Sequence, residues 1–320
     1  MKKDYSFETF DKRHIPKALD LVRKAYEEER AKVECLPHIE ALPSLNDFAR
    51  NQLGVAALYK NELVGFLCCL SPWNDFFGTS RGTFVPINAH ATVNEDRRML
   101  YSLLYEKAAS VWVRQGILSH AIGVYTQDTE AVESFFINGF GLRTIDAIRP
   151  LESIGMLETD LKLKYHELDE DRFSEILPQL NNLIGHLNSS PMFMPHRQID
   201  EKRFTDDVKR SKRRYFVAES DGRPIGHIKI TEGGESFIGE TGTMANIQGA
   251  YIYEEFRGIG VYTNLLEYTI NKLKDEGYHQ LGVDFESFNP MARGFWLKHF
   301  TPYIYGMTRR IDERIVKLYE

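Results

Sequence analysis

Short apolar runs alternate along the chain with longer amphipathic segments, a pattern typical of α/β proteins. In the second half, the apolar runs predict strands at residues 160–167, 215–220, 225–231, 245–253, 280–287 and 303–311. Apolar residues at three- and four-residue spacing predict helices at about 171–187, 200–211, 260–276 and from Pro290 onward. Gly277 is expected to cap the third helix at its C-terminus, and Asn289 to cap the last at its N-terminus.

The two halves of the chain resemble each other at an offset near 161 residues. Residues 55–65 fall on residues 216–226, and each stretch reads as an apolar strand, a turn and a second strand with glycine. Gly116 likewise falls on Gly277, at a helix end before a strand. We therefore expect two copies of one α/β domain, at residues 1–150 and 151–320, with the same order of elements.

Composition narrows the kind of partner. The 320 residues include 40 Lys and Arg against 46 Asp and Glu, a net charge of -6, which argues against a general binder of nucleic acid or membrane surfaces. Cys35, Cys68 and Cys69 have no metal-ligand spacing, so no metal is expected. No apolar stretch follows the N-terminal lysines, and no run approaches the ~20 apolar residues of a membrane helix. These features predict a cytoplasmic protein.

One glycine-containing segment predicts a phosphate site. Arg257, Gly258 and Gly260 lie between an apolar strand and a helix whose apolar face comprises Leu265, Leu266, Ile270 and Leu273. Glycines let the backbone approach a ligand, and a helix N-terminus stabilises phosphate. Arg257 would add a full positive charge, and the Thr263 hydroxyl one more hydrogen bond. The alternative is that the glycines only form a tight turn and Arg257 is a solvated surface residue.

Two motifs in this region resemble those of the GNAT superfamily of acetyl-CoA-dependent N-acetyltransferases. Residues 257–262 read Arg-Gly-Ile-Gly-Val-Tyr, similar to the signature Arg/Gln-x-x-Gly-x-Gly/Ala, with tyrosine at the last position. Residues 289–296 read Asn-Pro-Met-Ala-Arg-Gly-Phe-Trp, similar to the later helix Asn-x-x-Ala-x-x-Phe/Leu-Tyr. The resemblance covers about residues 160–315. It implies two tandem GNAT-like domains, each a mixed, mostly antiparallel sheet flanked by helices.

The resemblance also implies where the cosubstrate acetyl-CoA binds. It would lie between the fourth and fifth strands of the second domain, with its pantetheine arm pairing to the fourth strand. The cofactor-binding residues so implied are Ala250 and Ile252 on that strand, Arg257, Gly258, Gly260, Val261, Tyr262 and Thr263 in the loop and first helical turn, and Asn289. Asn289 is equally well explained as a helix cap alone.

In this family a neutral amine attacks the thioester directly, and a backbone N–H at the strand splay stabilises the oxyanion. A general base must take the amine proton. Asp284 and Glu286 are candidates because a period of two places them on one face of the fifth strand, opposite an apolar face; both could instead be merely exposed. Tyr251 and Tyr253 on the fourth strand are less favoured candidates.

The tyrosine that often protonates the departing thiolate is replaced here by Trp296. Tyr303, Tyr305 or water would have to serve instead, and Tyr303 is our candidate. In the first copy the phosphate loop itself is missing: Asp96 stands at the place of Arg257, Met99 at that of Gly260 and Tyr101 at that of Tyr262. With no glycine and two acids in this loop, we expect residues 1–150 to form a degenerate domain that does not bind acetyl-CoA productively.

The leading interpretation is a tandem N-acetyltransferase whose C-terminal domain transfers acetyl from acetyl-CoA to an amine of a small molecule or peptide. A non-catalytic acyl-CoA-binding or regulatory protein is the alternative, supported by Trp296. A third possibility is a transferase for longer acyl or aminoacyl donors, by resemblance only.

Overall fold

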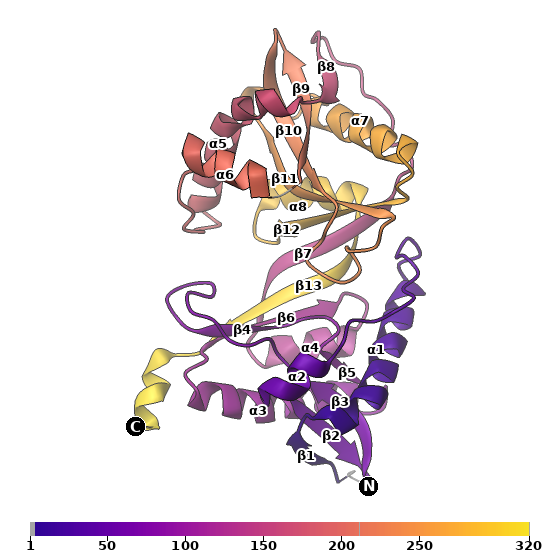
Figure 1. Cartoon of the computed structure of the whole chain (residues 1–320), viewed down its shortest axis with the longest axis vertical. Helices are drawn as coiled ribbons and strands as arrows, with labels where there is room; N and C mark the ends of the chain where they lie inside the picture. The colour runs from indigo at the N-terminus through magenta and orange to yellow at the C-terminus, as the bar shows by residue number, and fades with distance from the viewer. Residues whose placement is uncertain (1–3, 211, 320) are drawn as a thin grey trace. The chain divides into compact units, whose positions relative to one another are not determined.

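The computed structural model describes residues 4–319 apart from residue 211 (Figure 1). The chain divides into two compact units. Unit 1 comprises the residues up to Glu34, His38–Asp146 and the residues from Pro302 onward, and unit 2 comprises Cys35–Pro37 and Ala147–Thr301. In the described part of the chain, no helix combines the length and apolarity needed to cross a bilayer.

Unit 1 holds a four-stranded antiparallel sheet of order β1-β2-β3-β5, against which α1 and α3 pack. Its core contains the fully buried side chains of Phe10, Phe66, Trp112 and Phe135. The elements in chain order are β1 (Ser6–Thr9), α1 (Ile15–Arg30), α2 (Asn46–Asn51), β2 (Val55–Tyr59), β3 (Glu62–Leu67), β4 (Gly82–Val85), β5 (His90–Thr92), α3 (Arg97–Arg114), β6 (Ser119–Tyr125), α4 (Thr129–Ile137), the first part of β7 (Gly141–Pro150), and β13 (Thr301–Arg310).

A shared order of elements predicts one strand in the first copy at the place of the strand expected at residues 245–253, and this prediction is wrong. Two short strands replace it: β4, which pairs in parallel with β6, and the three-residue β5, which pairs with β3. Pro86 lies between them and has no N–H to continue a ladder, and its carbonyl instead closes a turn with the N–H of Ala89 (2.8 Å).

Unit 2 holds the strand order β12-β11-β10-β9-β8, with helices on both faces. Figure 1 shows α7 on one side of β9 to β11 and α5 and α6 on the other. The elements are β8 (Lys164–Glu167), α5 (Leu177–Asn188), α6 (Glu201–Arg210), β9 (Arg214–Ser220), β10 (Arg223–Thr231), β11 (Met244–Ile252), α7 (Val261–Asp275), β12 (Gln280–Glu286) and α8 (Pro290–His299). The apolar face predicted for the helix of residues 260–276 is confirmed, since Leu265, Leu266, Ile270 and Leu273 are fully buried.

Two irregularities in β11 position the site. Its parallel pairing with β12 runs from Met244 opposite Gln280 to Ile247 opposite Val283 and stops there, although both strands continue. At the same point the pairing of β11 with β10 shifts register, so that Gln248 is skipped between Ile247 and Gly249. A bulge of this kind bends and twists a strand. The strands therefore diverge beyond Ile247 and Val283.

The last strand groups with unit 1 by its contacts, whereas our sequence division placed it in the second copy. β13 pairs antiparallel with β6, from Ile304 opposite Tyr125 to Arg310 opposite Ser119. The residues of β7 from Ala147 onward belong to unit 2, where β7 neighbours β12. The compact units thus differ from the two sequence copies in the assignment of their terminal strands.

Candidate functional site

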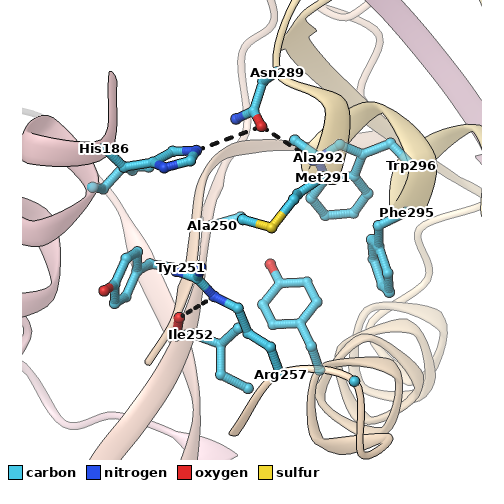
Figure 2. A pocket seen from close by; sticks show the side chains of 13 residues that line it. His186, Ala250, Tyr251, Ile252, Arg257, Asn289, Met291, Ala292, Phe295 and Trp296 are labelled. Carbon is cyan, nitrogen blue, oxygen red and sulfur yellow. Dashed lines mark hydrogen bonds between the residues drawn. The ribbon is translucent and has the colours of Figure 1, made fainter. Parts of the chain in front are cut away.

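A cavity of about 270 Å³ opens in unit 2 beside the diverging end of β11. Ala250, Tyr251 and Ile252 of β11 form one wall, and residues of α8 form another (Figure 2). The remaining walls come from the loop after β11, from Tyr262 of α7 and from α5. The lining residues are Leu183, His186, Ala250, Tyr251, Ile252, Arg257, Gly258, Tyr262, Asn289, Met291, Ala292, Phe295 and Trp296.

The glycine loop delivers the N-terminus of α7 to this cavity. Gly258 and Gly260 both have left-handed backbone conformations, with φ of 76° and 84°, which residues with a Cβ rarely adopt. Gly260 is the N-cap of α7, and no side chain in the described part of the chain caps the helix there. The N–H groups of the first helical turn therefore lack a side-chain acceptor, and the helix dipole adds a partial positive charge.

Arg257 lies over β11 in this structure. Its Nε donates to the carbonyl oxygen of Ile252 (3.2 Å), and its guanidinium carbon is 5.7 Å from the ring centroid of Tyr251 (Figure 2). One guanidinium group thus fixes the loop to the strand while its positive charge remains at the cavity wall.

Asn289 is both a helix cap and a cavity residue. Its Oδ1 accepts from the backbone N–H of Ala292 (3.4 Å) and lies 3.5 Å from Nε2 of His186 on α5 (Figure 2). The expected N-cap is confirmed, with Pro290 at the first helical position. Its side chain is buried, so the cap also shapes the cavity.

Tyr262 fills part of the cavity with an aromatic side chain. Its ring meets Phe295 and Trp296 of α8 edge to face, at centroid distances of 5.1 and 6.0 Å. The hydroxyl oxygen is buried and has no hydrogen-bond partner among the described residues. Burial raises the pKa of this hydroxyl well above its usual value, so it stays protonated.

The other predicted loop residues do not line the cavity. Val261 and Thr263 both belong to the first turn of α7. The side chain of Val261 is buried, and that of Thr263 is partly exposed. Gly260 faces the segment that precedes β8: a Cβ there would lie 3.1 Å from the Cβ of Leu157. Residue 260 must therefore be glycine for two reasons: its positive φ, and the lack of space for a Cβ beside Leu157.

Residues 153–157 are held against α7 by two buried polar side chains. Asn264 exchanges two hydrogen bonds with the backbone of Leu157 (2.7 and 2.9 Å). Glu267 accepts from the Ser153 hydroxyl (2.6 Å) and the Ile154 N–H (2.7 Å). Burial alone would raise the pKa of Glu267, but these hydrogen bonds lower it, so the carboxylate is ionised. α7 thereby fixes the chain that lies against the glycine loop.

The two acidic candidates occupy β12 just beyond its last pair with β11. Asp284 and Glu286 are partly exposed, while Leu281, Val283 and Phe285 on the opposite face are buried, as the period of two predicts. Burial raises the pKa of Asp284 to about 7, and the charges of Glu235 and Glu286 add to this shift while Lys229 opposes it. Neither acid lines the cavity itself.

Lys229 lies close to the divergence of the strands. Its side chain crosses Gly249 of β11, where a Cβ would lie 3.4 Å from the Lys229 Cβ. Burial lowers the pKa of Lys229, the Arg213 charge adds to this, and Asp284 opposes it. Lys229 and Asp284 therefore interact electrostatically near the point where the strands diverge.

Tyr303 belongs to unit 1. It is buried on β13, and its carbonyl oxygen accepts from the N–H of Thr126 (3.1 Å). It does not line the cavity of unit 2. The cavity residues that our sequence reasoning did not assign to the site include Leu183 and His186 of α5 and Met291 of α8. No motif marks the two α5 residues, and Met291 stands at a variable position of the motif at residues 289–296.

The corresponding region of unit 1 is built differently. Tyr101 precedes the helix-ending Gly116 by the same number of residues as Tyr262 precedes Gly277, and both glycines have positive φ. α3 has 18 residues and α7 has 15, and the additional turn of α3, residues 97–99, falls where α7 has its glycine loop. The loop that would bind phosphate is thus converted into helix.

Arg97 in this additional turn is buried in a network of acids. Its guanidinium pairs with Asp128 (3.0 Å) and Glu28 (2.8 Å) and donates to Asn94 (2.7 Å). Asp128 caps α4 through the N–H of Ala131, as Asn289 caps α8. In unit 1, an ion pair therefore joins the start of α3 to the cap of α4. The corresponding elements of unit 2, the start of α7 and the cap of α8, border the cavity.

Within the residues that the structure describes, no group of three or more His, Cys, Asp or Glu side chains is arranged to hold a metal ion.

The comparisons with known proteins agree with this geometry. Residues 181–300 match the model of the Acetyltransferase (GNAT) family. No curated protein sequence matches the chain. Among solved structures, a GCN5-related N-acetyltransferase from Sphaerobacter thermophilus superposes with a TM-score of 0.60 at 10% identity, covering 96% of this chain and 95% of that one.

A second structure is similar over part of its own length. It is described as a GCN5-related glucosamine N-acetyltransferase region in a fungal multi-domain GH3 β-N-acetylglucosaminidase; the TM-score is 0.53 at 12% identity, with 96% of this chain and 38% of that chain covered. A tandem GNAT protein from the clavulanic acid biosynthesis pathway covers 96% of this chain and 98% of its own, with 14% identity and a TM-score of 0.43.

The diverging strands, the glycine loop at a helix start and the adjoining cavity define an acyltransferase fold of the GNAT type. Residues 181–300 match the GNAT family model, and the structure from Sphaerobacter thermophilus has the same fold along nearly the whole chain, so the recognised GNAT domain lies in the second half. Proteins of this family are acetyltransferases that generally use acetyl-CoA.

Proposed function

We propose that unit 2 transfers an acetyl group from acetyl-CoA to an amine of a small molecule or peptide, in a ternary complex, and that the first copy is structural. The observation that carries this proposal is the open cavity between the uncapped start of α7 and the diverging end of β11. Holding the two substrates together there supplies much of the acceleration.

The residues present fit acetyl-CoA. The first-turn N–H groups of α7 and the charge of Arg257 suit the pyrophosphate, because they have donors and positive charge without a competing side-chain cap. Ala250 and Ile252 offer the edge of a strand that has left its neighbour, which suits the amide-containing pantetheine arm. Asn289 would contact the cofactor from α8.

Asp284 is the better of the two acidic candidates for the general base. A base with a pKa near the working pH combines a useful fraction of ionised carboxylate with sufficient basicity, and the pKa of Asp284 is about 7. The backbone at Gln248 and Gly249, where the strands diverge, is the proposed donor to the oxyanion. The amine would then attack between these two groups.

Unit 1 supplies no second acetyl-CoA site in this proposal. Its helix start has no glycine loop, and the Arg97 ion pairs occupy the region that corresponds to the cavity.

A charge-only change at Gly258 tests the cofactor site. Asn and Asp tolerate positive φ better than other residues with a Cβ, and a Cβ at Gly258 would meet no other atom within 4 Å. Gly258→Asn and Gly258→Asp differ in charge but hardly in shape. We expect Gly258→Asp to bind acetyl-CoA at least about tenfold more weakly than Gly258→Asn, measured by calorimetry, because the carboxylate opposes the pyrophosphate.

Two outcomes of these measurements would contradict the proposal. Equal affinities of the two variants would show that the pyrophosphate does not bind at this helix start. Wild-type protein that binds acetyl-CoA tightly but transfers acetyl to none of a broad panel of amines would instead favour the non-catalytic acyl-CoA-binding protein.

A further inference from the structure

The Tyr262 hydroxyl is a buried polar group with no partner among the described residues, and it belongs to a side chain that lines the cavity. Leaving a buried hydroxyl unpaired costs about 1–3 kcal/mol, so such a group in a cavity marks a place where a ligand atom can complete the hydrogen bond. The corresponding tyrosine in the first half of the chain indicates what kind of hydrogen-bond partner the Tyr262 hydroxyl would have.

Tyr101, the counterpart of Tyr262, has its hydrogen bond satisfied. Its hydroxyl lies 3.2 Å from Nδ1 of His90, whose Nε2 lies 2.7 Å from the carbonyl oxygen of Gly123. A carbonyl only accepts, so Nε2 carries the proton. Burial lowers the pKa of His90 to about 4, so the ring is neutral and Nδ1 accepts from Tyr101. The tyrosine is therefore a hydrogen-bond donor in unit 1.

The ladders identify which residue of unit 2 corresponds to His90. Gly65 pairs with Thr92, and its counterpart Gly226 pairs with Ile252. His90 precedes Thr92 by two residues, as Ala250 precedes Ile252. The position that the His90 imidazole occupies in unit 1 thus corresponds, in unit 2, to the space over the small side chain of Ala250. That space is part of the cavity.

The residue that Nε2 of His90 contacts, Gly123, also has a counterpart in unit 2. Gly123 follows Gly116 at the same spacing as Asp284 follows Gly277. The space that corresponds to the His90 ring therefore extends from the Tyr262 hydroxyl toward the position of Asp284 on β12. Asp284 is the proposed base, so the reacting thioester belongs in this interval.

We propose that the Tyr262 hydroxyl donates a hydrogen bond to the sulfur of coenzyme A as it leaves. This inference rests on the proposed function. The amine nitrogen forms a bond to the acetyl carbon, the C–S bond breaks with its electron pair on sulfur, and the amine proton passes to Asp284. Tyr262 keeps its proton while stabilising the thiolate, which then takes a proton from water. Trp296, whose indole N–H only donates, remains a packing partner of Tyr262.

The test compares coenzyme A with desulfo-coenzyme A, which lacks only the sulfur, in wild-type protein and Tyr262→Phe. Binding is measured by calorimetry at about pH 9, where thiols of ordinary pKa are substantially ionised. Besides Tyr262, the titratable or charged side chains that line the cavity are Tyr251, His186 and Arg257, all unchanged in the variant. We expect the variant to lose about tenfold or more in affinity for coenzyme A and to bind desulfo-coenzyme A as the wild type does.

Tyr268→Phe is the matched control. Tyr268 lies on the same helix, where it contacts Phe216, and it does not line the cavity. In turnover we expect Tyr262→Phe to lower kcat about tenfold or more while KM for acetyl-CoA stays within about twofold, and Tyr268→Phe to change neither.

Each other outcome overturns the inference in a recognisable way. Equal loss of affinity for both ligands would make Tyr262 a contact of the pantetheine arm and not of sulfur. No loss for either ligand, with unchanged kcat, would exclude any hydrogen bond from the hydroxyl. Wild-type protein that binds neither ligand would reject the proposed function together with this inference.

Discussion

The imidazole of His90 bridges two strands through its Nε2 atom, which lies 2.7 Å from the carbonyl oxygen of Gly123. It fills in unit 1 the space that corresponds to the cavity over Ala250 in unit 2. One difference between the two copies is therefore the side chain at this position, His90 in unit 1 and Ala250 in unit 2. The filled copy has a packed interior, and the open copy has room for a ligand.

Acetyl-CoA should bind with a stoichiometry of one per chain. The glycine loop precedes α7, whereas the corresponding turn of α3 has no glycine and carries the buried Arg97. Calorimetry on the whole chain checks this directly. The double variant His90→Ala with Arg97→Ala should still bind one molecule, because removing side chains does not restore the loop. Two molecules bound per wild-type chain would contradict the assignment of unit 1.

Arg97→Ala should destabilise the protein by about 3 kcal/mol, because it leaves the largely buried carboxylate of Asp128, and the partly exposed carboxylate of Glu28, without their cation. Arg98→Ala is the control: its pair with Glu133 is exposed by about half on both sides, so its loss should cost less than about 1 kcal/mol. Urea unfolding of both variants provides the comparison. Similar costs would mean that the buried network contributes nothing specific.

Asp284→Asn should lower kcat about 100-fold while leaving the affinity for acetyl-CoA nearly unchanged. In the wild type, kcat/KM should rise with pH through about 7, since the base works only when ionised. Glu286→Gln is the companion variant. A full loss of activity there, with Asp284→Asn active, would transfer the role of base to Glu286.

Asp284→Asn should lower activity but raise the stability of the folded protein above neutral pH. The pKa of Asp284 is about 7 in the folded protein and near 4 when unfolded, so the folded state binds the proton more tightly. Folding stability from this group is therefore present below pH 4 and is lost as pH rises toward 7. Asp284→Asn should stabilise the protein by on the order of 2 kcal/mol at pH 8 and hardly at pH 4. Thermal unfolding at both values checks the sign.

Asn264→Ala should release the chain beside the glycine loop. The side chain of Asn264 makes both hydrogen bonds to the backbone of Leu157, so its loss should speed amide exchange at Leu157 at least about tenfold. Lys272→Ala on the exposed face of the same helix is the control and should leave this exchange unchanged. Equal protection of Leu157 in both variants would show that the segment is held by other contacts.

Gly258 is a better position than Gly260 for a substitution that probes the phosphate loop. Replacing Gly260 would force both a left-handed residue with a Cβ and a contact 3.1 Å from Leu157, so loss of binding there would mix strain with charge. Gly258 has the same backbone requirement but open space around it, which is why the Asn and Asp pair is placed there.

Much of unit 2 could be predicted from the sequence because the signals are local. The cap at Asn289 depends on residues three apart, the buried face of α7 follows from helical spacing, and the glycine loop follows from Gly258 and Gly260 before an apolar helix. The alternation that places Asp284 opposite a buried face is likewise local. Such features depend mainly on residues that are close together in the sequence.

The remaining features depend on residues distant in sequence, and only the tertiary structure decided them. The three-residue β5, the grouping of β13 with β6, and the raised pKa of Asp284 each result from packing between separate elements. Tyr101 and Tyr262 look equivalent in sequence, yet one hydroxyl is satisfied by His90 and the other has no partner in the described structure. The sequence thus determined where a ligand-binding loop could form, and packing determined in which copy space was left for the ligand, because burial and hydrogen-bond satisfaction are properties of the assembled core.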